Sequence, residues 1–178
     1  MPYLEEVLAC VPTNAFAQLE LSIFGPEMPA KFDAAVKAAG HSERNILVSS
    51  GSLSSLAEFH RVNPKYRTLW LGAGAAPAKK SGKPWNVARV IEKAKAAGVD
   101  GVCPPCAVAM QIGLTPEMAD QVRAAGLDFR LFGVNSPDAL VYAASVRASA
   151  FTTDCWQQSF EWAKALPDVE VVREFSRQ

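Results

Sequence analysis

Two cysteines stand two prolines apart in GVCPPCAVAM, residues 101–110, which is the spacing of many redox-active pairs. In a thioredoxin-type pair the thiols lie at the N-terminus of a helix, whose dipole lowers a thiol pKa. The segment after Cys106 meets Gly113 and a new helix start at Thr115, so any helix that begins here is short. A redox role for Cys103 and Cys106 therefore stays open but is not favoured.

Cys155 follows a later apolar run, and we expect it at the same edge of the fold as Cys103 and Cys106. A three-cysteine metal site is one interpretation, although zinc takes about four Cys or His ligands. The simpler interpretation is a substrate-side loop in which two prolines stiffen the turn and the thiols fill small spaces. Four cysteines in 178 residues do not suggest a disulfide framework, and they fit a reducing compartment.

The histidines and serines give no catalytic pattern. His41 lies in a loop leading into an apolar run, and His60 lies in the last turn of a predicted helix, both away from the expected strand ends. General acid–base catalysis requires such groups within hydrogen-bond reach of the reacting atom. The serines within residues 49–52 lack a Gly-x-Ser-x-Gly elbow, so we expect them to form strand-end hydrogen bonds and a helix cap.

Three similar helix ends divide the chain: KAAG at 37–40, KAAG at 95–98 and RAAG at 123–126. Glycine after a basic last turn adopts the left-handed conformation that ends helices. A short apolar run, typical of a buried strand, follows each end. Strands that alternate with helices in this way are expected to be parallel.

The sequence predicts six strands and seven helices. The strands are expected at 17–23, 45–49, 67–72, 99–103, 128–133 and 148–152. The helices are expected at 3–10, 28–39, 53–62, 86–97, 116–125, 137–145 and 156–165. Two helix starts are clear, because Thr115-Pro116 and Ser136-Pro137 each combine a cap residue with a proline in the first turn.

The glycine-rich stretch GAGAAPAKKSGKP, residues 72–84, is interpreted as a long strand-to-helix loop. It lacks G-x-G-x-x-G, so we expect no dinucleotide site. Its lysines at 79, 80 and 83 form a small basic cluster, which is usually a solvated tip but could meet a phosphate-bearing ligand.

Length and composition indicate one domain over residues 1–178, and the 49% hydrophobic content allows a sizeable core. Acids and bases balance at 18 each, which argues against nucleic acid because duplex binding depends on clustered cations. No apolar run approaches the ~20 residues of a membrane helix. The N-terminus, MPYLEEVLACVP, has acids where a signal peptide is basic, so we expect no export signal and a cytoplasmic location by default.

Regular alternation of strands and helices is typical of a doubly wound sheet or a closed barrel. In both folds, the catalytic and ligand-binding residues lie at the carboxyl ends of the strands. The polar residues expected at those ends include Glu20, Ser22, Ser50 and Asn135.

Five segments in order resemble the glycerophosphodiester phosphodiesterases. LELSIFGP resembles their Glu-Leu-Lys strand, and NILVSSGSLSSLAEF resembles their Ser-Ser-Phe strand and the helix after it. GVDGVCP followed by GLTPEM resembles a Gly-Val strand and a Leu-Thr-Pro-Glu helix start. DFRLFGVN resembles a Trp-Thr-Val-Asn strand, and ASAFTTDCW resembles an Ile-Ile-Thr-Asp strand. The likeness runs over roughly residues 3–165.

The resemblance implies an α/β fold of the (β/α)8 TIM-barrel type, incomplete, with about six parallel strands that form its later three-quarters. It implies metal-dependent hydrolysis of glycerophosphodiesters to an alcohol and glycerol phosphate, with magnesium or calcium as the divalent metal. It implies that Glu20 is a carboxylate metal ligand, as suits a hard cation with oxygen ligands. It also implies that Ser22, Ser50, Phe132 and Asn135 bind substrate.

The chain also departs from the family pattern. The family's His-Arg-Gly and Glu-x-Asp strands, which carry its acid–base histidines and two more carboxylate ligands, have no counterpart here. Ser22 stands where the family has a phosphate-binding lysine, Gly51 replaces a phenylalanine, and Phe132-Gly133 replaces Trp-Thr. We therefore expect no catalytic residue in this chain and little or no hydrolysis by it alone.

Three functions stay open: part of a phosphodiesterase, a non-catalytic member that binds a phosphorylated polyol or a protein, and a thiol–disulfide module using Cys103 and Cys106. Six strands leave two open edges where a closed barrel has none. We therefore expect self-association, or a partner that covers those edges.

Overall fold

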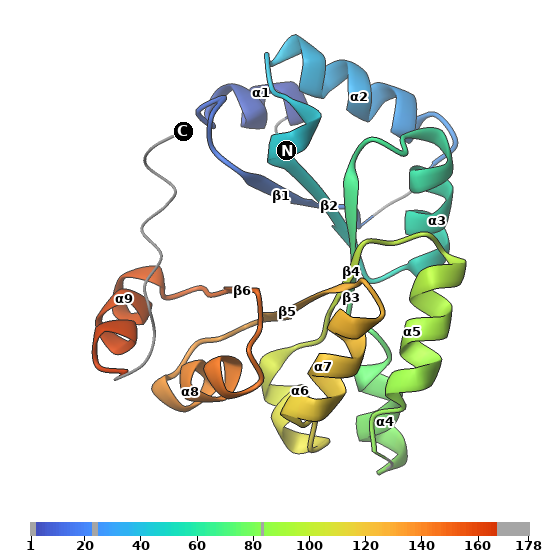
Figure 1. The fold of residues 1–178 in the computed structure, drawn as a ribbon. Helices are drawn as coiled ribbons and strands as arrows, with labels where there is room; N and C mark the ends of the chain where they lie inside the picture. Colours follow the sequence, from blue (N-terminus) through green and yellow to red (C-terminus); the bar gives the residue numbers. More distant parts are fainter. Residues whose placement is uncertain (1–2, 23–24, 83, 167–178) are drawn as a thin grey trace. The chain divides into compact units, whose positions relative to one another are not determined.

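The computed structural model describes residues 3–22, 25–82 and 84–166. The chain divides into two compact units. Unit 1 comprises Met1–Leu71 and Ala94–Asp100, and unit 2 comprises Gly72–Lys93 and Gly101–Gln178. In each unit, strands alternate with helices along the chain (Figure 1).

Unit 1 contains the first three strands: β1 (Ala17–Glu20), β2 (Ile46–Ser50) and β3 (Arg67–Leu71). Its helices are α1 (Leu4–Ala9), α2 (Met28–Ala38), the 3-10 turn η1 (Glu43–Asn45) and α3 (Leu53–Val62). β2 pairs in parallel with β1 on one side and β3 on the other. Every residue of β2 is buried, as expected for a central strand covered on both faces.

An aromatic cluster packs α2 and α3 of unit 1 against the residue that directly precedes β3. Phe32 of α2 meets Phe59 of α3 edge to face, with ring centroids 5.1 Å apart, and meets Tyr66 in the same way at 5.4 Å. All three rings are buried. Such edge-to-face pairs stabilise a core by about 0.5–1.5 kcal/mol beyond the burial of their area.

Unit 2 contains β4 (Gly101–Cys103), β5 (Asp128–Phe132) and β6 (Ala150–Thr152). Its helices are α4 (Ala75–Ser81), α6 (Cys106–Gln111), α7 (Pro116–Ala124), α8 (Pro137–Ser145) and α9 (Trp156–Lys164), and α5 (Val87–Ala96) begins in it. β5 pairs in parallel with β4 and with β6. Buried residues alternate with half-buried ones along β5, so Phe129 and Leu131 enter the core.

The helix signals in the sequence are confirmed. Thr115 and Ser136 cap α7 and α8, since their hydroxyls accept hydrogen bonds from the amides of Met118 and Ala139 at 3.4 and 3.2 Å. The glycines of the three repeated helix ends all have positive φ, which a side chain would strain: Gly40, Gly98 and Gly126.

Other predicted boundaries are wrong. The first strand, predicted over 17–23, ends at Glu20, and residue 23 lies outside the described residues. The last strand begins at Ala150 instead of residue 148. Residues 72–84 do not form a long loop, because α4 occupies most of that segment. Its alanines and lysines are good helix formers, and the left-handed Gly74 and Gly82 bound the helix. In the described part of the chain, no helix is both long enough and apolar enough to cross a bilayer.

Candidate functional site

The carboxyl ends of β1 and β2 lie together in unit 1. Glu20 is the register partner of Ser49, and the Leu21 amide donates to the Ser49 carbonyl at 2.7 Å. The Ser50 hydroxyl donates to the Leu21 carbonyl at 2.7 Å and accepts from the Ser52 amide at 3.2 Å. Ser50 is buried, so here its hydroxyl holds the segment that carries Glu20 and Ser22 in place.

Glu20 is exposed, and its carboxylate forms no hydrogen bond or ion pair with a described residue. Ser22, two residues further along, is exposed as well. Within the described ranges, no three His, Cys, Asp or Glu side chains gather closely enough to hold a metal ion. The residues present therefore do not fit a complete metal site, and Glu20 offers at most one of the oxygen-bearing side chains that such a site needs.

In unit 2, Asn135 organises the carboxyl end of β6. Its amide nitrogen donates to the Asp154 carboxylate at 2.6 Å, and its amide oxygen accepts from the Asp154 backbone at 2.9 Å and from the Thr153 hydroxyl at 3.1 Å. Thr153 also accepts from the Cys155 amide at 3.1 Å. Asn135 itself is exposed, so the network leaves it accessible while it fixes the turn into α9.

Phe132 ends β5 and is half-buried. Its amide donates to the Pro104 carbonyl at 3.3 Å, and Pro105 forms an isolated parallel bridge with it. The proline pair thus extends the pairing of β4 with β5 beyond the end of β4. This agrees with the interpretation of the two prolines as the stiff part of the loop.

The thiols of the C-x-x-C segment are buried. Burial raises the pKa of the Cys103 thiol to about 12, and it also raises the pKa of Cys106. A redox-active cysteine needs the opposite shift. Helix α6 begins at Cys106 and has only six residues, so Cys103 lies outside it. The geometry favours structural thiols, and Cys103, Cys106 and Cys155 form no three-cysteine metal group.

Neither histidine lies at a strand carboxyl end. His41 precedes η1 and is buried, with its Nε2 hydrogen-bonded to the Leu8 carbonyl at 3.0 Å. His60 lies in the last turn of α3, and its ring contacts the position that a Cβ on Gly98 would occupy. Both therefore have structural surroundings in unit 1.

The seven predicted helices include neither α4 nor α6, and the role of Thr153 was not predicted. The signal for α4 was present, because AAPAKKSG ends in a basic turn and glycine like the three repeated helix ends. Thr153 had no comparable signal, since its partner Asn135 lies 18 residues away in the sequence. The prediction that Glu20, Ser22, Ser50, Phe132 and Asn135 serve one site stays a prediction.

No family model matches the chain, and no curated protein matches it in sequence. Several solved structures match its fold. A protein from Agrobacterium tumefaciens assigned as a glycerophosphoryl diester phosphodiesterase has a TM-score of 0.71 at 22% identity, over 89% of this chain and 62% of its own. One from Silicibacter pomeroyi, with the same assignment, has a TM-score of 0.68 at 22% identity, over 86% and 52%. A glycerophosphodiester phosphodiesterase from Thermotoga maritima has a TM-score of 0.64 at 16% identity, over 90% and 63%.

The chain has the fold of these phosphodiesterases. The predicted fold class is confirmed: parallel strands alternate with helices as in an incomplete barrel of this phosphodiesterase type. The chain spans 52 to 63% of the length of these three phosphodiesterase structures. At 16 to 22% identity the likeness concerns the fold, and the chemistry has to be argued from the residues of this chain.

Proposed function

We propose that this chain is the later part of a phosphodiesterase-type barrel that binds a glycerophosphodiester, or a related phosphorylated polyol, at the carboxyl ends of its strands. The observation that carries the proposal is the fold match over 89% of the chain to an assigned glycerophosphoryl diester phosphodiesterase. In barrels of this class, ligands bind at that face because the strand-to-helix connections there can vary without disturbing the core.

Glu20 supports the proposal through its position and its freedom. It ends β1, it is exposed, and no described residue neutralises its charge. A magnesium ion is commonly held by one or two carboxylates together with the phosphate oxygens of the substrate. Glu20 would supply one carboxylate of that kind, and the other groups would come from outside the described residues.

Hydrolysis by residues 1–178 alone is not part of the proposal. The chain has two histidines, and both lie away from the strand carboxyl ends, so neither can transfer a proton to a phosphodiester bound there. We propose that the acid and base, if this polypeptide takes part in turnover, come from a further segment or a partner. A purely binding role is the alternative that the positions of His41 and His60 favour.

The open strand edges give such a partner a place to dock. Among the described strands, β1 pairs only with β2, and β6 pairs only with β5. Unpaired strand edges invite another strand. Self-association through these edges predicts a concentration-dependent mass in light scattering, and a constant monomer mass would remove this part of the proposal.

The test combines binding with turnover. We expect sn-glycerol 3-phosphate to bind more tightly when magnesium or calcium is present, as measured by isothermal titration calorimetry. Glu20→Gln should abolish the effect of the metal, whereas the control Glu5→Gln, an exposed carboxylate on α1, should leave it unchanged. Glycerophosphocholine should show no measurable hydrolysis. No gain in affinity on addition of magnesium or calcium, or an unchanged metal effect in Glu20→Gln, would contradict the role of Glu20.

A further inference from the structure

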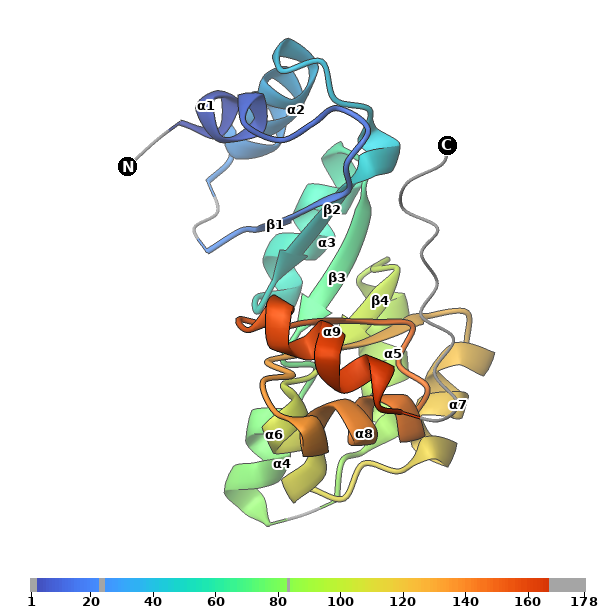
Figure 2. The same cartoon turned by 90° about the vertical axis from the view of Figure 1, so that its left-hand side faces the viewer.

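Two short helices of unit 2 stand on connections that leave the carboxyl ends of strands. α4 lies between β3 and α5, and α6 lies between β4 and α7. The Gly72 amide donates to the Cys103 carbonyl at 2.9 Å, which holds the start of the first connection beside the end of β4. The two helices contact each other and lie side by side in both views (Figure 1 and Figure 2).

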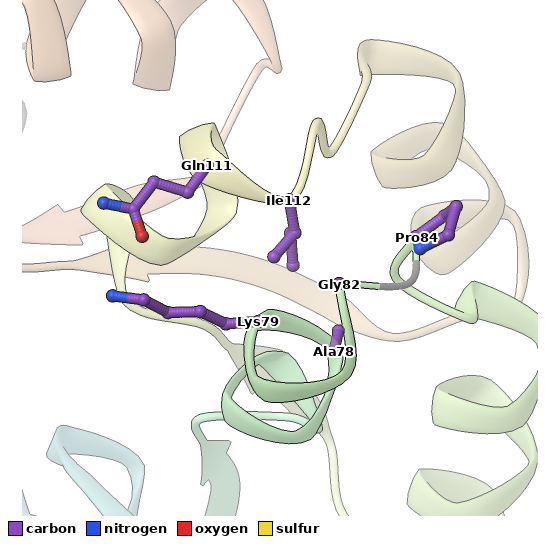
Figure 3. A pocket seen from close by; sticks show the side chains of 6 residues that line it. All are labelled: Ala78, Lys79, Gly82, Pro84, Gln111 and Ile112. Atoms are coloured by element: carbon purple, nitrogen blue, oxygen red, sulfur yellow. The ribbon is translucent and has the colours of Figure 1, made fainter.

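A pocket of about 230 Å³ lies between these helices. Its lining comes from the end of α4, the segment after it and the end of α6: Ala78, Lys79, Gly82, Pro84, Gln111 and Ile112. Figure 3 shows Ile112 pointing toward Ala78 and Gly82, while Lys79 and Gln111 extend toward the same side of the pocket. We call it the α4–α6 pocket. It is smaller than the ~300–1,000 Å³ sites of drug-sized molecules, so it suits a ligand of a few carbons.

The polar side chains of the α4–α6 pocket are available to bind a ligand. Lys79 and Gln111 are both exposed, and neither side chain forms a hydrogen bond or ion pair with a described residue. An ammonium group and an amide N–H that extend to one side together offer donors to a single anionic group. The apolar part of the lining, from Ala78, Pro84 and Ile112, would contact the carbon skeleton of the same ligand.

The charge of the surrounding sequence gives a second and independent indication. The two helices themselves, residues 75–81 and 106–111, contain two lysines and no aspartate or glutamate. The chain as a whole has 18 acidic and 18 basic residues, so these helices depart from the balance elsewhere. A locally positive field raises the concentration of anions at the pocket and disfavours cationic ligands.

We propose that the α4–α6 pocket binds a small organic anion, in which a phosphate or carboxylate group meets Lys79 and Gln111 and a short aliphatic part meets Ile112. The proposal does not depend on Glu20 or on a metal ion. It also gives a reason for the two helices that interrupt the strand-to-helix connections, because without α4 and α6 the pocket would have no walls.

The test is a titration of the chain in metal-free buffer, followed by nuclear magnetic resonance of the backbone amides. Inorganic phosphate and succinate serve as the two anionic probes, and choline serves as the cationic one. We expect saturable shifts at Gly82, Gln111 and Ile112 with at least one anion and none with choline. Because no metal is present, a failure of the metal-dependent binding proposed for Glu20 would not affect this result.

Lys79→Gln should weaken binding of the anion about tenfold, as expected for the loss of one charge-assisted contact. Lys80→Gln is the matched control, since it removes the same charge from the next residue of α4, which does not line the pocket. Equal weakening by both variants would show general attraction to a basic surface and overturn the proposal. The absence of saturable shifts at the pocket amides with both anions would overturn it as well.

Discussion

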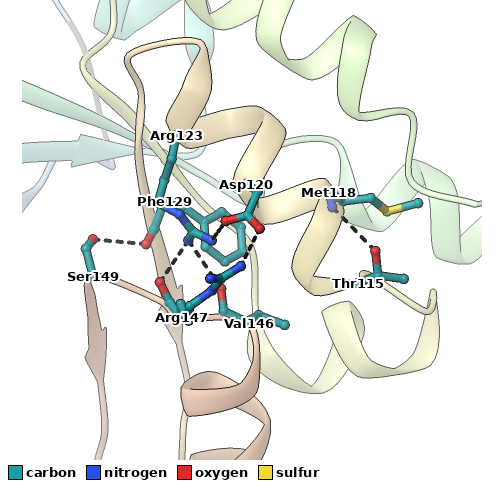
Figure 4. A network of polar contacts seen from close by, with 8 residues as sticks. All are labelled: Thr115, Met118, Asp120, Arg123, Phe129, Val146, Arg147 and Ser149. Carbon is teal, nitrogen blue, oxygen red and sulfur yellow. Dashed lines mark hydrogen bonds and ion pairs between the residues drawn. The ribbon is translucent and has the colours of Figure 1, made fainter. Parts of the chain in front are cut away.

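The two ends of the β5–β6 pair in unit 2 are built from different side chains. At the amino end, Arg123 donates to the carbonyls of Val146 and Arg147 at 3.2 and 2.8 Å, and Asp120 pairs with both arginines (Figure 4). At the carboxyl end, the amide of Asn135 and neighbouring hydroxyls hold the turn. Ion pairs join the strand–helix connections at the amino end. At the carboxyl end, the Asn135 amide, the Thr153 hydroxyl and the Asp154 carboxylate join them by hydrogen bonds without an ion pair.

The difference shows where side chains are left over for a ligand. At the amino end, the charges of Asp120, Arg123 and Arg147 are satisfied within the protein. Glu20, at the carboxyl end of β1 in unit 1, and Lys79, on α4 in unit 2, form no ion pair with a described residue. A barrel-type fold usually separates a stabilising face from a ligand-binding face in this way.

The largest expected effect concerns the thiols at the carboxyl end. Burial raises the pKa of the Cys103 thiol to about 12, so this thiol is almost entirely protonated at pH 8. Relative to an ordinary thiol, alkylation by iodoacetamide should be about a thousandfold slower, because the thiolate is the reactive form. Mass spectrometry should find Cys10, which is exposed, labelled long before Cys103. Equal labelling rates for Cys10 and Cys103, or a disulfide between Cys103 and Cys106, would support the redox interpretation instead.

The next effect concerns Asp128 at the amino end. Its carboxylate pairs with Arg130 at 2.7 Å and accepts from the Ser149 hydroxyl, and the Asp128 and Arg130 side chains are only 14% and 15% exposed. Asp128→Ala removes a partner of a largely buried guanidinium, so the free energy of unfolding should fall by about 2 kcal/mol. Urea unfolding measures this loss. The control Asp128→Asn keeps an acceptor for the Ser149 hydroxyl but removes the negative charge. If Asp128→Asn lowers the free energy of unfolding as much as Asp128→Ala does, the whole effect belongs to the ion pair with Arg130.

At the carboxyl end, we expect a smaller loss of stability with a local effect on the turn. Asn135→Ala should cost about 1 kcal/mol, since its hydrogen bonds are exposed. Hydrogen exchange of the Asp154 amide should become faster, because that amide donates to Asn135. Asn135→Asp should lower the free energy of unfolding more at neutral pH than at pH 3, since it places a second carboxylate against Asp154. Unchanged exchange in Asn135→Ala would contradict the role of this side chain in the turn.

The smallest effect is a pH dependence confined to the amino end. The Arg123 guanidinium holds the pKa of Asp120 below its usual range, with a further contribution from Arg147. A carboxyl whose pKa is lower in the folded protein stabilises it above the unfolded pKa, and this stabilisation is lost as pH falls through the folded pKa. The urea midpoint of the wild type should therefore fall more between pH 6 and pH 3 than that of Asp120→Asn. Identical pH profiles would show that the pair contributes nothing.

Local sequence signals predicted most of the elements, because helix caps and glycine stops act over a few residues. Thr115, Ser136 and Gly126 show this clearly. The same signals were present around α4, but the glycines at 72 and 74 suggested a loop instead. The Asn135–Asp154 contact and the α4–α6 pocket could not be predicted, since each joins segments that only the fold brings together.

The central proposal is that ligands bind at the carboxyl ends of the strands and that Glu20 contributes a metal ligand there. Paramagnetic broadening by manganese, in the presence of sn-glycerol 3-phosphate, tests it most directly. The account predicts stronger loss of amide signals at Leu21 and Ser22 than at Ala17 and Ile46, which pair at the amino ends of β1 and β2, and no broadening in Glu20→Gln. Broadening that is strongest at Ala17 and Ile46, or broadening of Leu21 that persists in Glu20→Gln, would contradict the account.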